Sequence, residues 1–104
     1  MPKPYELRYL PLFWDDLNEA VSYIADHLKN PQAAERLVDN VEDAILQYQK
    51  NPLLGHEYRS TREHAEQYRW FAVDNYLIFY VVLGDVMEVR RLIYGARDLT
   101  RLVP

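Results

Sequence analysis

Residues 68–94 decide the fold and read YRWFAVDNYLIFYVVLGDVMEVRRLIY. β-branched and aromatic residues dominate this stretch, and they are the residues that favour β-strands. Asp74-Asn75 and Gly84-Asp85 interrupt it, and such pairs are common where a tight turn joins two strands. The stretch therefore predicts three antiparallel strands in a meander.

The middle strand of this meander is apolar in both of its alternating sets, so both of its faces should be covered and it should be a central strand. One set is Tyr76, Ile78, Tyr80 and Val82, and the other is Leu77, Phe79, Val81 and Leu83. The third strand alternates between an apolar set, Met87, Val89 and Ile93, and a second set, Glu88, Arg90 and Leu92. Arg91 interrupts the apolar set, and a charge at that place needs a specific reason.

The N-terminal half predicts one strand and two helices. Tyr5 to Tyr9 alternates and should be a short strand, and Pro11 can begin a helix. Asn30 is the expected N-cap of a second helix, with Pro31 in its first turn, and this helix should run to about Lys50. The stripe of the first helix is Trp14, Leu17, Val21, Ile24 and Leu28, and that of the second is Ala34, Leu37, Val38, Val41, Ile45 and Tyr48. Three acids near the start of the first helix should interact favourably with the positive end of its dipole, namely Asp15, Asp16 and Glu19.

These elements predict a single α+β domain over residues 1–104, in the order β-α-α-β-β-β. The short connection between the helices makes them an antiparallel hairpin that packs on one face of the antiparallel sheet. The first strand should join the meander, in an orientation that the pattern leaves open. Residues 55–67 are polar without a period and are expected to form a loop. The side chains expected to face one another in the core are Trp14, Leu17, Val21, Val41, Ile45, Phe79 and Val81.

Composition limits the function classes. The chain has 104 residues, no cysteine and a formal net charge of -4, which argues against binding nucleic acid through a broad basic surface. No apolar run approaches the roughly 18 residues of a membrane span, and the start lacks a signal-peptide pattern, so a cytoplasmic protein without membrane contact is expected. The histidines, His27, His56 and His64, are too scattered for a zinc site, and neither a metal nor another cofactor is expected.

Arginines are the first candidates for a functional site. The second half of the chain carries seven bases, all arginine, and the planar guanidinium suits phosphate or carboxylate groups. Arg69, Arg91 and Arg97 could converge with Tyr94 on the sheet face that the helices leave uncovered. The alternative is that these arginines are solvated and paired with nearby acids.

Two further sets of residues carry weaker signals. His56 and Glu57, with His64, could be an acid/base pair, although a polar loop with histidines is often only a loop. The strand tyrosines could stack on nucleic-acid bases, and the alternative is that they are core or half-buried residues. These tyrosines are Tyr68, Tyr76, Tyr80 and Tyr94.

The order of several segments resembles the RelE/ParE superfamily of bacterial toxins from type II toxin–antitoxin modules. The segments are the helical hairpin followed by NPLLG, then YRWFAVDNYLIFYVV, then EVRRLIYGARDL, which ends in the tail motif Gly95 to Asp98. The resemblance covers Pro11 to Leu99. It implies the α+β fold described above and a cognate antitoxin as partner.

The resemblance leaves two branches open. RelE-like members are ribosome-dependent endoribonucleases that cut mRNA, and ParE-like members are associated with inhibition of DNA gyrase. Arg97 matches the tail arginine of the RelE-like branch, but Leu77 and Val103 stand where that branch places an arginine and a catalytic tyrosine. The ParE-like branch is therefore favoured, with gyrase as the expected target. The alternatives are a ribosome-directed nuclease, with substitute chemistry from His56, Glu57 or Tyr94, and an inactive binding module.

Overall fold

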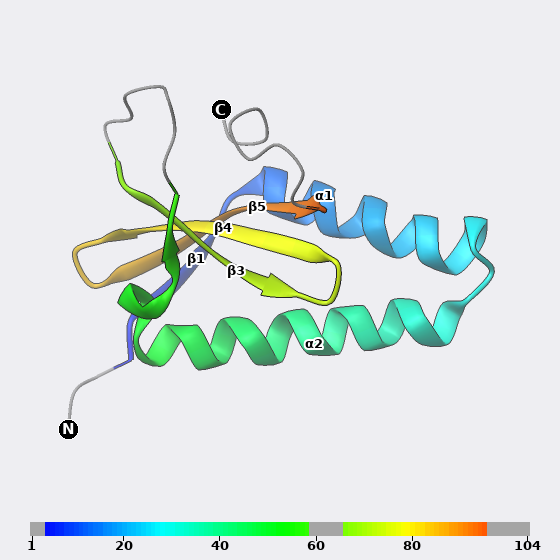
Figure 1. The fold of residues 1–104 in the computed structure, drawn as a ribbon, viewed down its shortest axis with the longest axis horizontal. Helices are drawn as coiled ribbons and strands as arrows, with labels where there is room; N and C mark the ends of the chain where they lie inside the picture. The colour runs from blue at the N-terminus through cyan, green and yellow to red at the C-terminus, as the bar shows by residue number, and fades with distance from the viewer. Residues whose placement is uncertain (1–3, 59–65, 96–104) are drawn as a thin grey trace.

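The computed structural model describes residues 4–58 and 66–95. Helices cover one face of a five-stranded sheet whose strand order is β1-β5-β4-β3-β2 (Figure 1). The elements in chain order are β1 (Glu6–Tyr9), α1 (Pro11–Ser22), the π-helical turn η1 (Tyr23–His27), α2 (Pro31–Lys50), the 3-10 turn η2 (Pro52–Leu54), β2 (His56–Glu57), β3 (Tyr68–Val73), β4 (Tyr76–Leu83) and β5 (Val86–Tyr94). The predicted α+β class and the order of the main elements are confirmed.

Strands β3, β4 and β5 form the predicted antiparallel meander. Its turns lie at Asp74-Asn75 and Gly84-Asp85, and Asp74 and Gly84 have φ angles of 54° and 63°. β4 is the central strand, and its residues Tyr76 to Val81 are all buried. The prediction that both faces of this strand are covered is therefore confirmed.

Two features of the sheet were left open or missed by the sequence patterns. β1 pairs in parallel with β5, with Glu6 opposite Val86 and Tyr9 opposite Val89, so the sheet is mixed. β2 lies in the segment expected to be a loop and pairs antiparallel with β3. It is only two residues long, which is too short for an alternating pattern to reveal.

A β-bulge at Arg90 corrects the predicted faces of the third strand. Phe79 lies opposite Arg91 and Tyr80 lies opposite Val89, so Arg90 is the extra residue. One additional residue reverses the alternation beyond it. Leu92 therefore packs in the core under the helices, where Ile93 was expected, and Ile93 packs on the opposite face.

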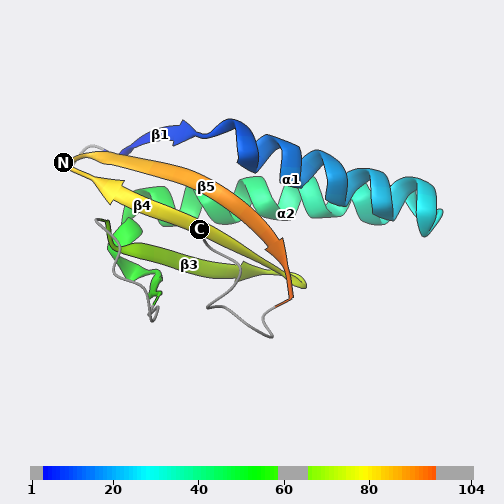
Figure 2. The same ribbon diagram turned by 90° about the horizontal axis from the view of Figure 1, so that it is seen from above.

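The helical hairpin has the predicted caps. Pro11 and Pro31 lie in the first turns of α1 and α2, and the Asn30 side chain accepts a hydrogen bond from the Ala33 backbone N–H at 3.1 Å. α2 ends at Lys50 as predicted. Both ribbon views show the tip of the hairpin extending beyond the strands (Figures 1 and 2). That overhang leaves the end of α1 and the turn η1 with only part of their inner surface against the sheet.

The core corrects the predicted set of facing residues. α1 buries Phe13, Leu17 and Ala20, whereas Trp14 is 46% exposed and packs at the edge against the Tyr9 ring, at a centroid distance of 4.9 Å. Phe13 and Trp14 are neighbours about 100° apart on the helix, so only one of them can point at the sheet. The main core on the helix side consists of Phe13, Leu17, Ala20, Leu37, Val41, Ile45, Phe71, Val73, Tyr76, Ile78, Tyr80, Met87, Val89 and Leu92.

The odd-numbered residues of β4 face away from the helices. Leu77 and Phe79 form a second cluster with Tyr58, and the half-buried rings of Tyr68 and Trp70 pack against it. The expectation that Phe79 and Val81 face the helix stripes is therefore wrong, since helix-facing Ile78 and Tyr80 have the opposite parity. The sheet is covered on its second face by its own aromatic side chains.

Candidate functional site

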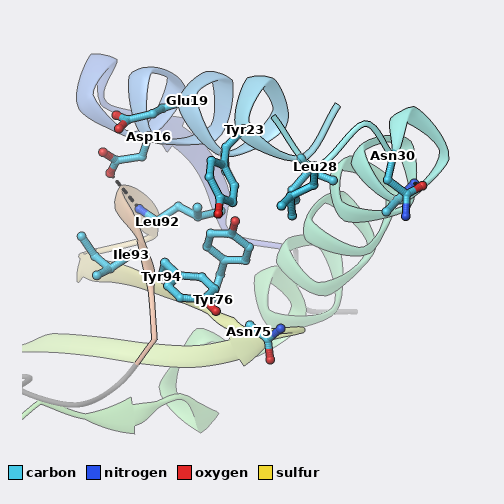
Figure 3. A pocket seen from close by; sticks show the side chains of 13 residues that line it. Asp16, Glu19, Tyr23, Leu28, Asn30, Asn75, Tyr76, Leu92, Ile93 and Tyr94 are labelled. Carbon is cyan, nitrogen blue, oxygen red and sulfur yellow. Dashed lines mark hydrogen bonds between the residues drawn. The ribbon is translucent and has the colours of Figure 1, made fainter. Parts of the chain in front are cut away.

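A groove of about 730 Å³ opens where the overhanging hairpin meets the ends of β4 and β5 (Figure 3). Its surface is mostly apolar, and its polar side chains lie at the borders. The lining residues are Asp16, Glu19, Ala20, Tyr23, Ile24, Leu28, Asn30, Ala33, Asn75, Tyr76, Leu92, Ile93 and Tyr94. An open, largely apolar depression with a few polar groups is suited to binding part of another molecule.

Three tyrosines line this groove. Tyr76 is buried, and its ring meets that of Tyr94 edge to face at a centroid distance of 5.3 Å. Burial raises the pKa of the Tyr76 hydroxyl above its ordinary value, and the neighbouring hydroxyls of Tyr94 and Tyr23 add to this effect. Tyr23 and Tyr94 are 51% and 70% exposed. Large aromatic surface therefore faces solvent on both sides of the groove.

Asp16 explains the unexpected arginine of β5. Arg91 donates two hydrogen bonds to its carboxylate, from Nε at 2.7 Å and from Nη2 at 3.1 Å, and the Leu92 backbone N–H donates a third at 3.0 Å. β1 pairs with β5 only as far as Val89, so the Asp16 carboxylate serves the unpaired edge beyond it. The hydrogen bond to Asp16 raises the pKa of Arg91. Asp16 thus fixes α1 to β5, whereas its position near the start of the helix had suggested a role at the positive end of the helix dipole.

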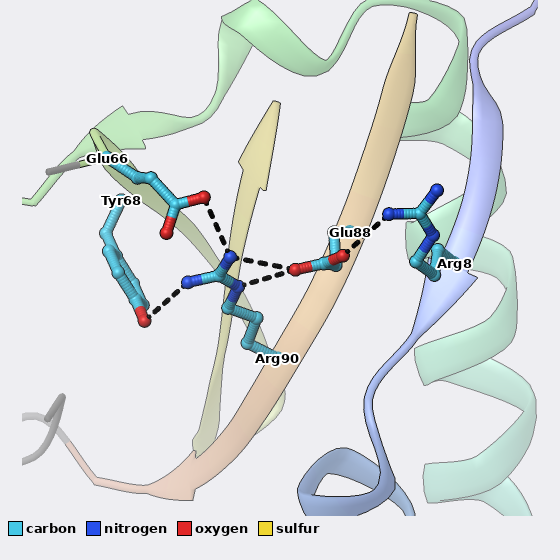
Figure 4. A network of polar contacts seen from close by, with 5 residues as sticks. All are labelled: Arg8, Glu66, Tyr68, Glu88 and Arg90. Carbon is cyan, nitrogen blue, oxygen red and sulfur yellow. Dashed lines mark hydrogen bonds and ion pairs between the residues drawn. The ribbon is translucent and has the colours of Figure 1, made fainter. Parts of the chain in front are cut away.

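A second polar site lies on the sheet face away from the helices (Figure 4). Glu88 is buried and accepts hydrogen bonds from Arg8 at 3.1 Å and from Arg90 at 2.9 Å. Arg90 also donates to the Tyr68 hydroxyl at 2.9 Å and to Glu66 at 3.0 Å. Burial alone would raise the pKa of Glu88, but the hydrogen bonds from the two arginines outweigh it and lower that pKa. The bulge at Arg90 allows one guanidinium to reach three partners.

Arg69, one of the predicted site residues, is used inside the fold. Its Nη1 donates to the backbone carbonyls of Leu53 and Gly55, both at 3.1 Å, and its Nη2 lies 3.6 Å from a carboxylate oxygen of Glu57. These bonds fix the turn η2 beside β3. Arg69 and Arg91 therefore do not converge, because each guanidinium points to a different partner at a different edge of the meander.

The remaining predicted residues are separated. His56 packs on Trp70 at a centroid distance of 4.5 Å, and Tyr94 lines the groove. Arg97 and His64 lie outside the described residues. Within residues 4–58 and 66–95, no three side chains of the types that ligate metals gather into a site. None of the described helices is long and apolar enough to cross a membrane.

Neither the groove nor the role of Asp16 was predicted from the sequence. A signal for Asp16 existed in Arg91, which interrupts the apolar set of the third strand, since a half-buried guanidinium requires a carboxylate from an adjacent element. The groove had no such signal. The groove exists because the helices of the hairpin extend past the strands of the sheet. The pattern of residues in the sequence does not show how long the helices are relative to the strands they pack against.

Comparison with known proteins adds to this geometry. A family model described as "ParE toxin of type II toxin-antitoxin system, parDE" matches residues 7–99. No curated relative matches the chain in sequence. A solved structure described as "Chromosomal ParDE TA system from P. aeruginosa" contains a chain with a TM-score of 0.70 and 15% identity, over 88% of this chain and 97% of that one. At this identity the likeness shows a shared fold.

Proposed function

We propose that this chain, which belongs to the ParE toxin family of type II toxin–antitoxin systems, arrests growth by binding DNA gyrase and is neutralised by a cognate antitoxin. The match of residues 7–99 to the family carries the proposal. The gyrase target follows the ParE-like branch that the sequence favours. The antitoxin follows from the toxin–antitoxin organisation that names the family.

The second face of the sheet supports a toxin without nuclease chemistry. Cleavage of RNA at a 2′-hydroxyl needs an acid, a base and cations that stabilise the negatively charged transition state. Leu77, at the position where the nuclease branch has arginine, is buried in the cluster with Phe79 and Tyr58. Arg90 on the same face is already held by carboxylates. The described part of this face therefore offers RNA little free positive charge.

The groove is the proposed docking site for an amphipathic segment of the antitoxin. An amphipathic helix buries its apolar side in such a depression and leaves its polar side in water. Ile24 and Leu28 supply apolar surface on one side of the groove, and Ile93 and the Tyr94 ring supply it on the other. Leu28 lines the groove and is 54% exposed, so a partner that covers it removes this apolar surface from water.

A pair of leucine substitutions tests this docking site. Leu28→Asp places a charge in the groove, and Leu54→Asp is the matched control, because Leu54 is 72% exposed in η2 and does not line the groove. We expect Leu28→Asp to weaken the complex with the co-expressed antitoxin by at least roughly 30-fold, the effect of losing a strong interface contact. Equal affinity of the two variants in calorimetric titration would reject the groove as the site.

The target is tested by expression without antitoxin. We expect intact mRNA in primer extension on a reporter transcript and loss of supercoiling by purified gyrase in the presence of the toxin. Codon-positioned cuts within minutes of induction would instead establish the ribosome-dependent nuclease. Growth arrest with neither effect would place the target elsewhere.

Arg97→Ala should weaken toxicity, because a guanidinium suits a carboxylate or phosphate on the target, with Arg101→Ala as the matched control.

A further inference from the structure

The polar groups at the groove have a defined arrangement. The hydroxyls of Tyr23 and Tyr76 point toward each other, and the carboxylates of Asp16 and Glu19 lie together at one side of the cavity (Figure 3). Tyr94 presents the most exposed of the three rings. The same small region therefore combines aromatic faces with carboxylates.

Only one of these two carboxylates is available to a partner. Asp16 is saturated by Arg91 and by the Leu92 N–H, so the charges of Asp16 and Arg91 cancel. Glu19 makes neither an ion pair nor a hydrogen bond within residues 4–58 and 66–95, and the described lining contains no basic side chain. The groove consequently carries one uncompensated negative charge beside exposed tyrosine rings.

We propose that an arginine of the antitoxin's amphipathic segment occupies this end of the groove, an inference that rests on the proposed function. A guanidinium stacks on a tyrosine face and at the same time donates paired hydrogen bonds to a carboxylate. The Glu19 carboxylate and the Tyr23 ring supply these two partners, because residues four apart on a helix lie on the same face, and Tyr23 is 51% exposed. Aliphatic residues about one helical turn away on the same segment then cover Ile24 and Leu28.

The charge of the groove distinguishes this occupant from others. A nucleic acid would bring its negatively charged phosphates toward the Glu19 carboxylate, and the described lining has no basic side chain to bind them. A lysine would pair with Glu19, but its compact ammonium group lacks the planar face that stacks on a ring. A second copy of this chain is the remaining occupant, and it would appear as a concentration-dependent dimer that Glu19→Gln weakens in the absence of antitoxin.

The first arm of the test compares two substitutions that change the net charge equally. Glu19→Gln removes the groove carboxylate, and Asp15→Asn removes an exposed carboxylate of the same helix that does not line the groove. We expect Glu19→Gln to raise the Kd of the antitoxin complex about tenfold and Asp15→Asn to change it less than twofold. Tyr23→Leu, which keeps an apolar side chain but removes the ring, should raise the Kd several-fold.

The second arm uses the antitoxin's groove-binding segment as a synthetic peptide. Each arginine is replaced in turn by citrulline, which keeps the shape of the side chain but has no charge. One replacement should weaken binding about tenfold to the parent toxin and have little further effect on Glu19→Gln, as expected for a coupled pair. Unchanged affinity of Glu19→Gln, additive losses at every arginine, or dimerisation through the groove would each overturn the arginine site. Failure of the antitoxin to bind the parent chain would instead overturn the proposed function.

Discussion

Gly55→Ala tests how closely the turn η2 approaches the core. A Cβ atom on Gly55 would lie 1.9 Å from the Tyr80 hydroxyl oxygen and 2.8 Å from the ring carbon that carries it. The backbone angles of Gly55, φ -64° and ψ 155°, are ordinary for any residue. The substitution therefore acts through contact with Tyr80 and not through backbone strain.

The magnitude follows from what Tyr80 must give up. Its side chain is fully buried, and its hydroxyl donates a hydrogen bond to the Pro52 carbonyl. To reach a normal contact of about 3.5 Å, the hydroxyl has to withdraw by roughly 1.5 Å. Overpacking costs about 1–3 kcal/mol, and the lost buried hydrogen bond costs about 1–3 kcal/mol more. We expect Gly55→Ala to lower the free energy of unfolding by about 2–6 kcal/mol.

A double-mutant cycle with Tyr80→Phe separates these two contributions. Tyr80→Phe removes the oxygen that the new methyl group meets and already loses the hydrogen bond, so Gly55→Ala should cost about 1–3 kcal/mol less in that background. The assay is urea unfolding of the four proteins near neutral pH. Burial raises the pKa of Tyr80 to about 12, so its hydroxyl remains a donor there. Additive effects, or a Gly55→Ala variant as stable as the parent, would refute this reasoning.

Three further substitutions test other contacts. Asp16→Asn should cost about 2 kcal/mol in urea unfolding, because the half-buried Arg91 loses its charged partner, and the prediction fails if Arg91→Leu is equally harmful in both backgrounds. Glu88→Gln should lower the free energy of unfolding by about 3 kcal/mol at pH 7. The folded-state pKa of Glu88 lies below its unfolded value near 4.3, so this cost should shrink as the pH falls below about 4. A cost that stays constant from pH 7 to 3 would contradict this prediction. Asn30→Ala should cost about 1 kcal/mol through the lost N-cap, seen as a Tm lower by roughly 4–8 °C, whereas Asn30→Asp should keep most of it.

The parts of the fold that depend on local chemistry were predictable from the sequence. The turns of the meander are set by residues such as Asp74 and Gly84 that accept positive φ angles. The start of α2 is set by Asn30 and Pro31, whose side chains act within one helical turn. These signals are short-range, so they survive without knowledge of the tertiary structure.

The predictions that were wrong concern residues whose position depends on packing between elements far apart in the sequence. Trp14 and Phe13 are both apolar and adjacent, and only the direction of α1 relative to the sheet selects Phe13 for the core. The parity of β5 changes at Arg90 because of a bulge that no residue type marks. For the candidate site, the sequence identified Arg91 as anomalous but not Asp16 as its partner, because the two elements meet only after folding.

The parallel pairing of β1 with β5 has a consequence for synthesis on the ribosome. Arg8 and Glu88, which face each other across these strands, are 80 residues apart in the chain. At about 5–20 residues per second, roughly 4–16 s of translation separate the appearance of one from that of the other. β1 has no strand to join until β5 has been synthesised, and the β5 side of the groove appears at the same stage. A partner that recognises the finished groove must therefore act after β5 has been synthesised and has paired with β1.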